Sequence, residues 1–260
     1  MVISKKLIPF IIFLLCCAIL IGQHYYVTAR RASFEADRTR YISDILRITE
    51  GVSPVLWIDP QYSYISDAKY FDLSGNENHG TQDNVDYQPT VAPPGLDFDG
   101  DDDYVDCGDG IQSITDAITI EAWVKPASLA NKYVVSQQGS WRLGFGAYGT
   151  AVDGIFTTSS GNLIPHTAIS QDVWSHVVLT YDKSITTDAA KIFVNGVLKD
   201  TEDGVGDSLS SSSYPLTFGA RGPDWGYHNG IIDEVRIYNR ALSATQIQQL
   251  YLLGLSRHRQ

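Results

Sequence analysis

The sequence predicts an all-β protein, an antiparallel sandwich of two sheets, that follows a long helical segment at its N terminus. After Pro54, runs of about five to eight residues rich in Val, Ile, Thr, Tyr, Phe and Trp are separated by Gly, Asn, Asp, Ser and Pro. Many short strands at this spacing are typical of a sandwich. Before Pro54, an apolar run and then an amphipathic run have helical character. A chain of 260 residues has room for one large β domain.

Residues 1–27 predict a transmembrane anchor or a signal segment. Lys5 and Lys6 precede an apolar stretch that Tyr25, Tyr26 and Val27 extend to about the 20 residues that a spanning helix needs. The early lysines favour a cytoplasmic N terminus. A cleaved signal peptide is the alternative, although "AILIGQ" is a poor cleavage site. We therefore expect a membrane-anchored protein with an extracellular main domain, or a secreted one if the segment is cleaved.

Residues 28–51 predict an amphipathic stalk helix. Phe34, Tyr41 and Ile45 recur at mostly helical spacing between alternating charges, and Gly51 with Pro54 ends the pattern. An apolar helix, an amphipathic helix and a β-rich head also make up the layout of pilin-like filament subunits. The sequence lacks the small residue of a leader-cleavage site and a glutamate just inside the apolar run. Because of these missing features, self-assembly through residues 7–50 is only an alternative to the predicted main function, and it would make the protein a structural subunit.

The charge distribution argues against nucleic acid as a partner. The net charge is -11, and residues 1–50 carry seven basic and four acidic side chains, so the rest of the chain is more acidic still. Phosphate backbones would be repelled. Of the three cysteines, only Cys107 lies outside the apolar N-terminal run. The body therefore has no disulfide framework, and Cys107 is expected to be a small buried hydrophobe.

The strands of the body follow from alternation and from turn residues. In the run Ala117–Pro126, the residues Ile118, Ile120, Ala122 and Val124 would share one face. The dipeptide Asn195-Gly196 is a strong hairpin signal. Further strands are predicted at Trp174–Asp182, Ala190–Asp200, Tyr214–Arg221 and Gly230–Arg240.

One helix is predicted in the body, close to its end. Ser243 can cap it, Ile247 and Leu250 would line its buried face, and Gly254 would end it.

Six motifs in one order make the body resemble laminin-G-like, concanavalin-A-like jelly-roll domains of the pentraxin-related type. The motifs are "FDLSGNENHGT", "LDFDGDDDYVD", "ITIEAWVKP", "WSHVVLTYD", "KIFVNGV" and "GIIDEVRIYNRALSATQI". The resemblance covers residues 55–253, within a domain that we place at residues 52–255. It implies a two-sheet antiparallel jelly roll in which the first and last strands lie side by side.

The acidic motif "DFDGDDDYVD" holds six aspartates in ten residues. The resemblance implies a strand, a turn that Gly100 permits, and a second strand, with Phe98 and Tyr104 as anchors. Asp101, Asp102 and Asp103 would then face water.

A calcium site is expected in the loop "DLSGNENHG". Asp72, Asn76 and Asn78 would offer oxygens to one point, and Ca²⁺ takes six to eight oxygen ligands. The resemblance implies that Asp233 on the last strand could add a second carboxylate. The alternative is an Asx-rich turn that is held by its own hydrogen bonds.

The sequence argues against an enzyme. A glycoside hydrolase needs two carboxylates across one cleft. The strand of Glu121 holds one acidic residue, and the adjacent Asp233 and Glu234 would point to opposite faces of their strand.

Recognition of an extracellular ligand is the predicted function, with a glycan or a cell-surface protein as the partner. Loops at the ends of a sandwich are common binding positions, whereas Trp57, Trp123 and Trp174 are expected in the core. The candidate ligand-binding residues are Trp225, Tyr227, His228 and Asn229 in one loop, and Trp141 and Arg142 in another.

Overall fold

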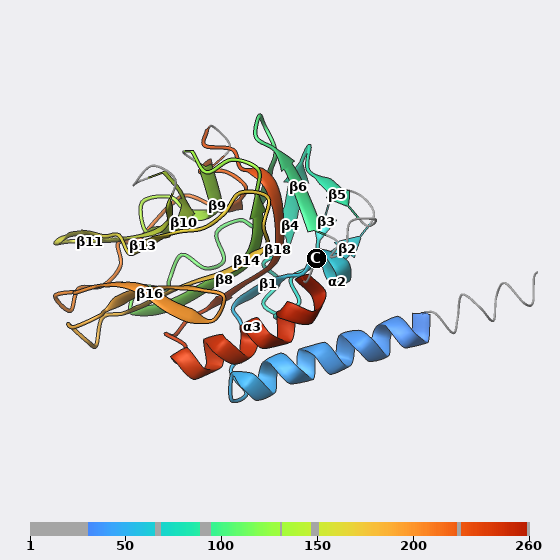
Figure 1. The fold of residues 1–260 in the computed structure, drawn as a ribbon, viewed down its shortest axis with the longest axis horizontal. Helices are drawn as coiled ribbons and strands as arrows, with labels where there is room; N and C mark the ends of the chain where they lie inside the picture. Colours follow the sequence, from blue (N-terminus) through green and yellow to red (C-terminus); the bar gives the residue numbers. More distant parts are fainter. Residues whose placement is uncertain are drawn as a thin grey trace, which may run out of the picture. The chain divides into compact units, whose positions relative to one another are not determined.

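A computed structural model describes residues 31–65, 69–88, 95–130, 132–146, 151–222 and 225–258. The chain forms two compact units, residues 1–47 and 48–260, and Figure 1 shows their elements. The predicted anchor at residues 1–27 lies outside the described residues.

The first unit contains the predicted amphipathic helix. Residues 31–48 are helical, and the pairs Glu35–Arg38 and Asp44–Arg47 join side chains one turn apart. Across the part of the chain that the structure describes, no helix combines the length and apolar character needed to cross a membrane.

The second unit is the predicted sandwich, and within the described residues its two sheets hold eight and ten strands. The eight-stranded sheet runs β16 (Val197–Glu202), β15 (Ala190–Val194), β14 (Ser175–Asp182), β8 (Ala117–Pro126), β18 (Asn229–Tyr238), β6 (Gly95–Asp99), β5 (Asp86–Gln88), with β1 (Leu56–Ile58) also on β18. The ten-stranded sheet runs β12 (Gly161–Leu163), β11 (Ala151–Thr158), β10 (Trp141–Phe145), β9 (Lys132–Gln137), β17 (Leu216–Phe218), β7 (Tyr104–Asp106), β4 (Gly80–Asp83), β3 (Lys69–Tyr70), β2 (Tyr64–Ile65), with β13 (His166–Ala168) on β11. The pairing of β1 with β18 is antiparallel and confirms that the first and last strands are neighbours.

The main core lies between the two sheets. The alternation predicted for β8 is confirmed, because Ile118, Ile120, Ala122 and Val124 are all buried in this core. Val135, Leu143 and Phe156 of the ten-stranded sheet belong to the same cluster. The hairpin at Asn195-Gly196 is also confirmed: both residues have positive φ, and β15 and β16 pair across them.

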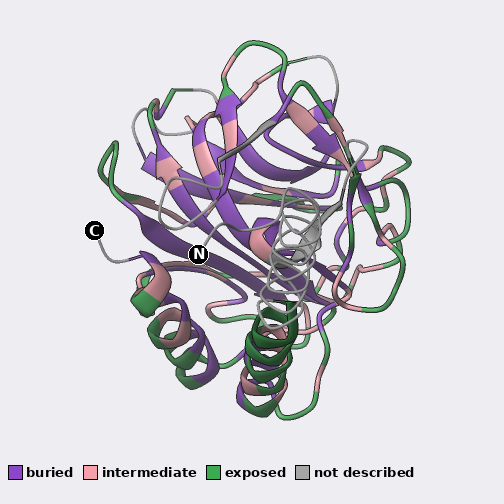
Figure 2. Cartoon of the chain, turned by 90° about the vertical axis from the view of Figure 1, so that its right-hand side faces the viewer, coloured by how far each residue is buried: buried purple, intermediate pink, exposed green. Residues whose placement is uncertain are grey.

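The helix α3 (Ala244–His258) covers the outer face of the eight-stranded sheet. In that sheet, Trp123 of β8 pairs with His176 of β14 and Asp233 of β18. The indole of Trp123 stacks on His258 with ring centroids 3.9 Å apart. Figure 2 shows the helix buried along one side and exposed along the other. The predicted cap is confirmed, since Ser243 and Gln246 exchange hydrogen bonds.

Gly254 does not end the helix, so this part of the prediction was wrong. A Cβ on Gly254 would lie 2.5 Å from the Trp123 Nε1 atom. The residue is therefore a glycine because of close packing, and the helix continues to His258, whose ring contacts Trp123. The small helix α2 (Pro60–Ser63) follows β1.

Replacing Gly254 by valine should lower the free energy of unfolding by about 2 kcal/mol, because the new side chain overpacks the Trp123 contact. Thermal or urea unfolding measures this change. Gln249→Val places the same β-branched side chain at an exposed position of α3 and should change stability by only about 0.5 kcal/mol. Equal effects of the two variants would contradict the packing role.

Candidate functional site

The strand carboxylate Glu121 lies in a buried charged layer beneath α3 and is not exposed in a cleft. It contacts the Arg236 Nε atom, and the His176 Nε2 atom lies 3.2 Å from its Oε2. All three side chains are fully buried. Burial alone would raise the pKa of Glu121, but Arg236 and His176 outweigh it and hold that pKa below its ordinary value.

A β-bulge brings Asp233 and Glu234 to the same side of β18. The register between β18 and β8 shifts between Asp233 and Arg236, and Glu234 has a positive φ of 51°. Oxygens of both carboxylates and a His258 nitrogen lie within 4.8 Å of one another. The expectation that the two residues point to opposite faces was therefore wrong, because regular alternation fails at a bulge.

Arg257 and Arg236 neutralise most of this layer. Arg257 contacts Glu234 and lies 2.9 Å from Asp59, while Arg236 lies 3.0 Å from Glu234. Burial raises the pKa of Asp59 to about 6 despite the opposing effect of Arg257. These carboxylates are buried and bonded within the protein, so they fasten α3 to the sheet and have no access to a polymer outside.

The predicted calcium loop is a hydrogen-bonded turn around Asp72. Its Oδ1 accepts from the backbone N–H groups of Trp57 and Ser74, each at 2.9 Å. Its Oδ2 accepts from the Ser74 hydroxyl at 2.6 Å and from the Asn78 N–H at 3.1 Å. Four bonds use the acceptor sites of this carboxylate. A calcium ion at Asp72 would have to displace them, so these residues fit the Asx-turn alternative better than an ion cage.

The other proposed ligands have separate partners. The Asn76 and Asn78 side-chain amides both donate to the backbone carbonyl of Val55, at 3.3 and 2.8 Å. The Asp233 Oδ2 atom lies 3.0 Å from His258, within the layer under α3. The structure thus brings Asp72 together with Asn78, but it groups Asp233 with Glu234 and His258.

The acidic motif forms the predicted strand, turn and strand, although its two strands, β6 and β7, belong to different sheets. Asp103 is buried and accepts a hydrogen bond from the Asp99 N–H at 2.7 Å, so the expectation that it faces water was wrong. Asp99, Asp102 and Asp103 place carboxylate oxygens within 4.8 Å of one another. Asp102 also accepts from the Asn84 amide at 3.0 Å.

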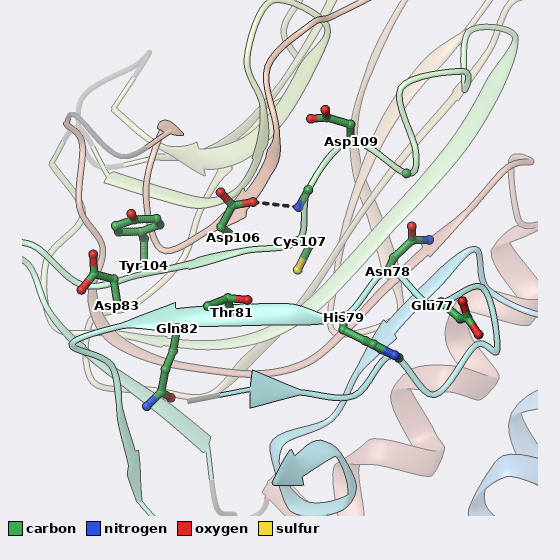
Figure 3. A pocket seen from close by; sticks show the side chains of 12 residues that line it. Glu77, Asn78, His79, Thr81, Gln82, Asp83, Tyr104, Asp106, Cys107 and Asp109 are labelled. Atoms are coloured by element: carbon green, nitrogen blue, oxygen red, sulfur yellow. Dashed lines mark hydrogen bonds between the residues drawn. The ribbon is translucent and has the colours of Figure 1, made fainter. Parts of the chain in front are cut away.

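An open groove of about 880 Å³ lies on the outer face of the ten-stranded sheet, over β4 and β7 (Figure 3). We call it the acidic groove, because Glu77, Asp83, Asp106 and Asp109 line it. Burial and the neighbouring Asp83 carboxylate raise the pKa of Tyr104, which also lines the groove. The four carboxylates give this surface a strongly negative potential, which repels anions.

A second groove, of about 270 Å³, lies on the same face over β9, β10 and β11. We call it the arginine groove, because Arg142 and Arg221 line it together with Tyr133. The Arg142 guanidinium lies 4.8 Å from the centre of the Tyr133 ring and 2.8 Å from Asp153. Arg221 lies 4.7 Å from the ring of Trp225, which in turn meets Tyr133 edge-on at 5.4 Å. The groove thus combines cations and aromatic rings.

The loop after β17 separates the two grooves. Thr217 pairs with Ser136, a residue of the arginine groove, and with Asp106, a residue of the acidic groove. The Gly222 N–H donates to the Thr217 hydroxyl at 3.1 Å, which places the loop over this strand. The predicted strand Tyr214–Arg221 is shorter than expected, because its second half belongs to this loop.

The six predicted ligand-binding residues divide by exposure. Trp225 is 46% exposed, and Tyr227 and Arg142 are partly exposed. Asn229 donates to the Asp99 carbonyl at 2.6 Å and so ties β18 to β6.

Trp141 and His228 are both buried, although Trp141 also lines the arginine groove. Trp141 belongs to the core between the sheets, because it alternates with the outward-facing Arg142. His228 is fully buried between Phe98 and Phe145, and burial lowers its pKa to about 3. It therefore stays neutral and anchors the end of the loop.

Tyr133 and Arg221 are residues of the arginine groove that sequence reasoning missed. Alternation could have found Tyr133, which shares a face with Arg142 once β9 and β10 are paired, whereas Arg221 lies in the loop after β17, where no strand pattern applies. The bulge between Leu143 and Gly144 hides this register in the sequence.

Two stacked antiparallel sheets, with grooves on one outer face, define a jelly-roll domain of the lectin-like class. A family profile described as the concanavalin A-like lectin/glucanases superfamily matches residues 99–248. The match covers more than half of the chain, which therefore belongs to this superfamily.

Solved structures share the fold. Domain 4 of AbnA, a GH43 extracellular arabinanase from Geobacillus stearothermophilus in complex with arabinotriose, is 19% identical with a TM-score of 0.60, covering 77% of this chain and 98% of that one. The botulinum neurotoxin serotype G binding domain is 16% identical with a TM-score of 0.59, covering 78% and 52%. A botulinum neurotoxin type C structure, described as dependent on two ganglioside molecules for cell entry, is 15% identical with a TM-score of 0.58, covering 77% and 51%.

These likenesses show the fold alone, and the chain spans about half the length of the neurotoxin domains. Among curated proteins, none matches the chain significantly.

Removing the central cation of the buried layer should strongly destabilise the sandwich. Arg236→Met leaves Glu121 and Glu234 buried with less compensation, so the free energy of unfolding should fall by about 3–5 kcal/mol. Arg47→Met, at an exposed arginine, should change it by only about 0.5 kcal/mol. Chemical denaturation measures both, and a loss for Arg236→Met as small as that of the control would refute the role of the layer.

The loop of Asp72 should stabilise the fold without a metal. Asp72→Ala should lower the melting temperature by the same amount in calcium and in chelator, because the lost interactions are hydrogen bonds to the chain. Differential scanning calorimetry of the wild type and the variant checks this. A calcium-dependent rise in the wild type that Asp72→Ala removes would instead establish a calcium site, because a ligand of the folded state alone raises its stability.

Proposed function

We propose that this protein recognises glycans on the outer face of its ten-stranded sheet, at the arginine groove. The observation that carries the proposal is the exposed Trp225, which is held between Tyr133 and Arg221 at the edge of a polar groove. Aromatic rings can pack against the apolar face of a sugar ring, while a few placed polar groups fix its orientation. The groove supplies such groups from Ser136, Gln138, Thr157 and Asn162.

The comparisons support this proposal at the level of the fold. The AbnA domain is described with arabinotriose, and the type C neurotoxin structure is described with gangliosides. Because a fold does not by itself define a ligand, the specific argument rests on the residues of the groove.

We propose binding without hydrolysis. The carboxylates that a hydrolase of this fold could place on its strands, namely Glu121, Asp233 and Glu234, are fully buried in contact with arginines and histidines. A general acid and its partner must instead reach the glycosidic bond from both sides.

The cellular setting is part of the proposal and rests on the sequence. An apolar segment at residues 1–27 would hold the head at a cell surface, where glycan recognition would serve adhesion. Self-assembly through residues 7–50 and a structural calcium ion stay predictions from the sequence.

A glycan array probed with the full-length chain tests the proposal, with calcium and with chelator in parallel. Trp225→Ala should weaken binding at least about tenfold, because a tryptophan ring that packs against the ligand commonly contributes this much. Phe71→Ala is the matched control, since Phe71 is also 46% exposed but packs on His79 at the acidic groove. Absence of binding to every glycan would overturn the function, and loss in the Phe71 variant alone would move the site.

A further inference from the structure

The two cations of the arginine groove differ in how far their charge is compensated. Arg142 is 12% exposed and lies 2.8 Å from the buried carboxylate of Asp153. Arg221 is partly exposed, and in the described part of the chain its side chain contacts the Trp225 ring and no carboxylate. Arg221 therefore gives the groove a positive charge that no carboxylate among the described residues contacts.

Backbone hydrogen bonds at Arg221 and at Gly226 fix the positions of Arg221 and Trp225. The Arg221 N–H donates to the Trp225 carbonyl at 3.0 Å. The Tyr133 N–H donates to the Gly226 carbonyl at 3.0 Å, and the Gly226 backbone packs on the Tyr133 ring so closely that a Cβ would lie 2.4 Å from it. A guanidinium that is stacked on an aromatic ring keeps its N–H fork free, and little side-chain freedom is left to lose on binding.

We infer that the arginine groove takes an acidic sugar, with the sugar carboxylate paired to Arg221 and the ring packed against Trp225. This inference rests on the proposed function and names its ligand class. The guanidinium fork matches the planar carboxylate of a sugar acid with two parallel hydrogen bonds. The neighbouring acidic groove repels anions, so the carboxylate has one favourable position on this face.

Acidic oligosaccharides and their carboxyl-reduced counterparts, which share one skeleton, test the inference with the full-length protein. Binding measured by calorimetry or on an array should be about tenfold tighter for the acidic form, as expected for a charged hydrogen-bonded pair. Arg221→Gln should weaken binding of the acidic oligosaccharide until its affinity equals that of the carboxyl-reduced counterpart. Arg221→Lys, which keeps the charge but loses the fork, should retain part of the preference.

Lys199→Gln is the matched control, because it removes one exposed positive charge from β16 in the other sheet and should leave the preference unchanged. The preference should also weaken with added salt. Equal binding of acidic and reduced forms, together with a loss caused by Trp225→Ala, would overturn the inference and leave glycan recognition intact. Absence of binding to both forms would also overturn the inference, whereas the proposed function falls only if the array shows no binding to any glycan.

Discussion

The ion pair between Arg236 and Glu121 sets the arrangement of the eight-stranded sheet and its helix. Two buried charges are expensive unless they are closely paired, and breaking such a pair leaves the remaining charge without compensation. Glu121 is on β8, Arg236 is on β18, and the bulge at Glu234 brings a second carboxylate to the same arginine. Arg257 and His258 then connect α3 to this layer, so the C-terminal helix and the central strands depend on one electrostatic arrangement.

That arrangement also limits where the proposed recognition could occur. The outer face of the eight-stranded sheet is covered by α3, and its carboxylates are used inside the protein. The outer face of the ten-stranded sheet carries both grooves, divided by the loop that Thr217 and Tyr133 hold. One sheet therefore contributes stability through its outer face, while the other presents side chains to solvent.

Alternation and turn chemistry made most of the sandwich predictable. The bounds of β8, the hairpin at Asn195-Gly196 and the contact of the first strand with the last follow from local patterns and from the resemblance. The predictions were wrong where tertiary contacts override those patterns. Gly254 does not end the helix but leaves room for the Trp123 ring, and Glu234 lies on the same side as Asp233 because of a bulge. For the proposed binding surface, the sequence pointed to Trp225 and Arg142, but Tyr133 and Arg221 join them only through strand register and loop packing.

The charge on this face changes sign across the loop between the grooves. On one side of the loop, Arg221 is cationic. On the other side, Asp106 and Asp83 make the acidic groove negative. A polysaccharide with a carboxylate on every sugar unit would be attracted at the arginine groove and repelled at the acidic groove. Under the binding mode that we infer, such a surface would distinguish a single or terminal acidic unit from a uniformly charged chain through the electrostatic gradient along one row of strands.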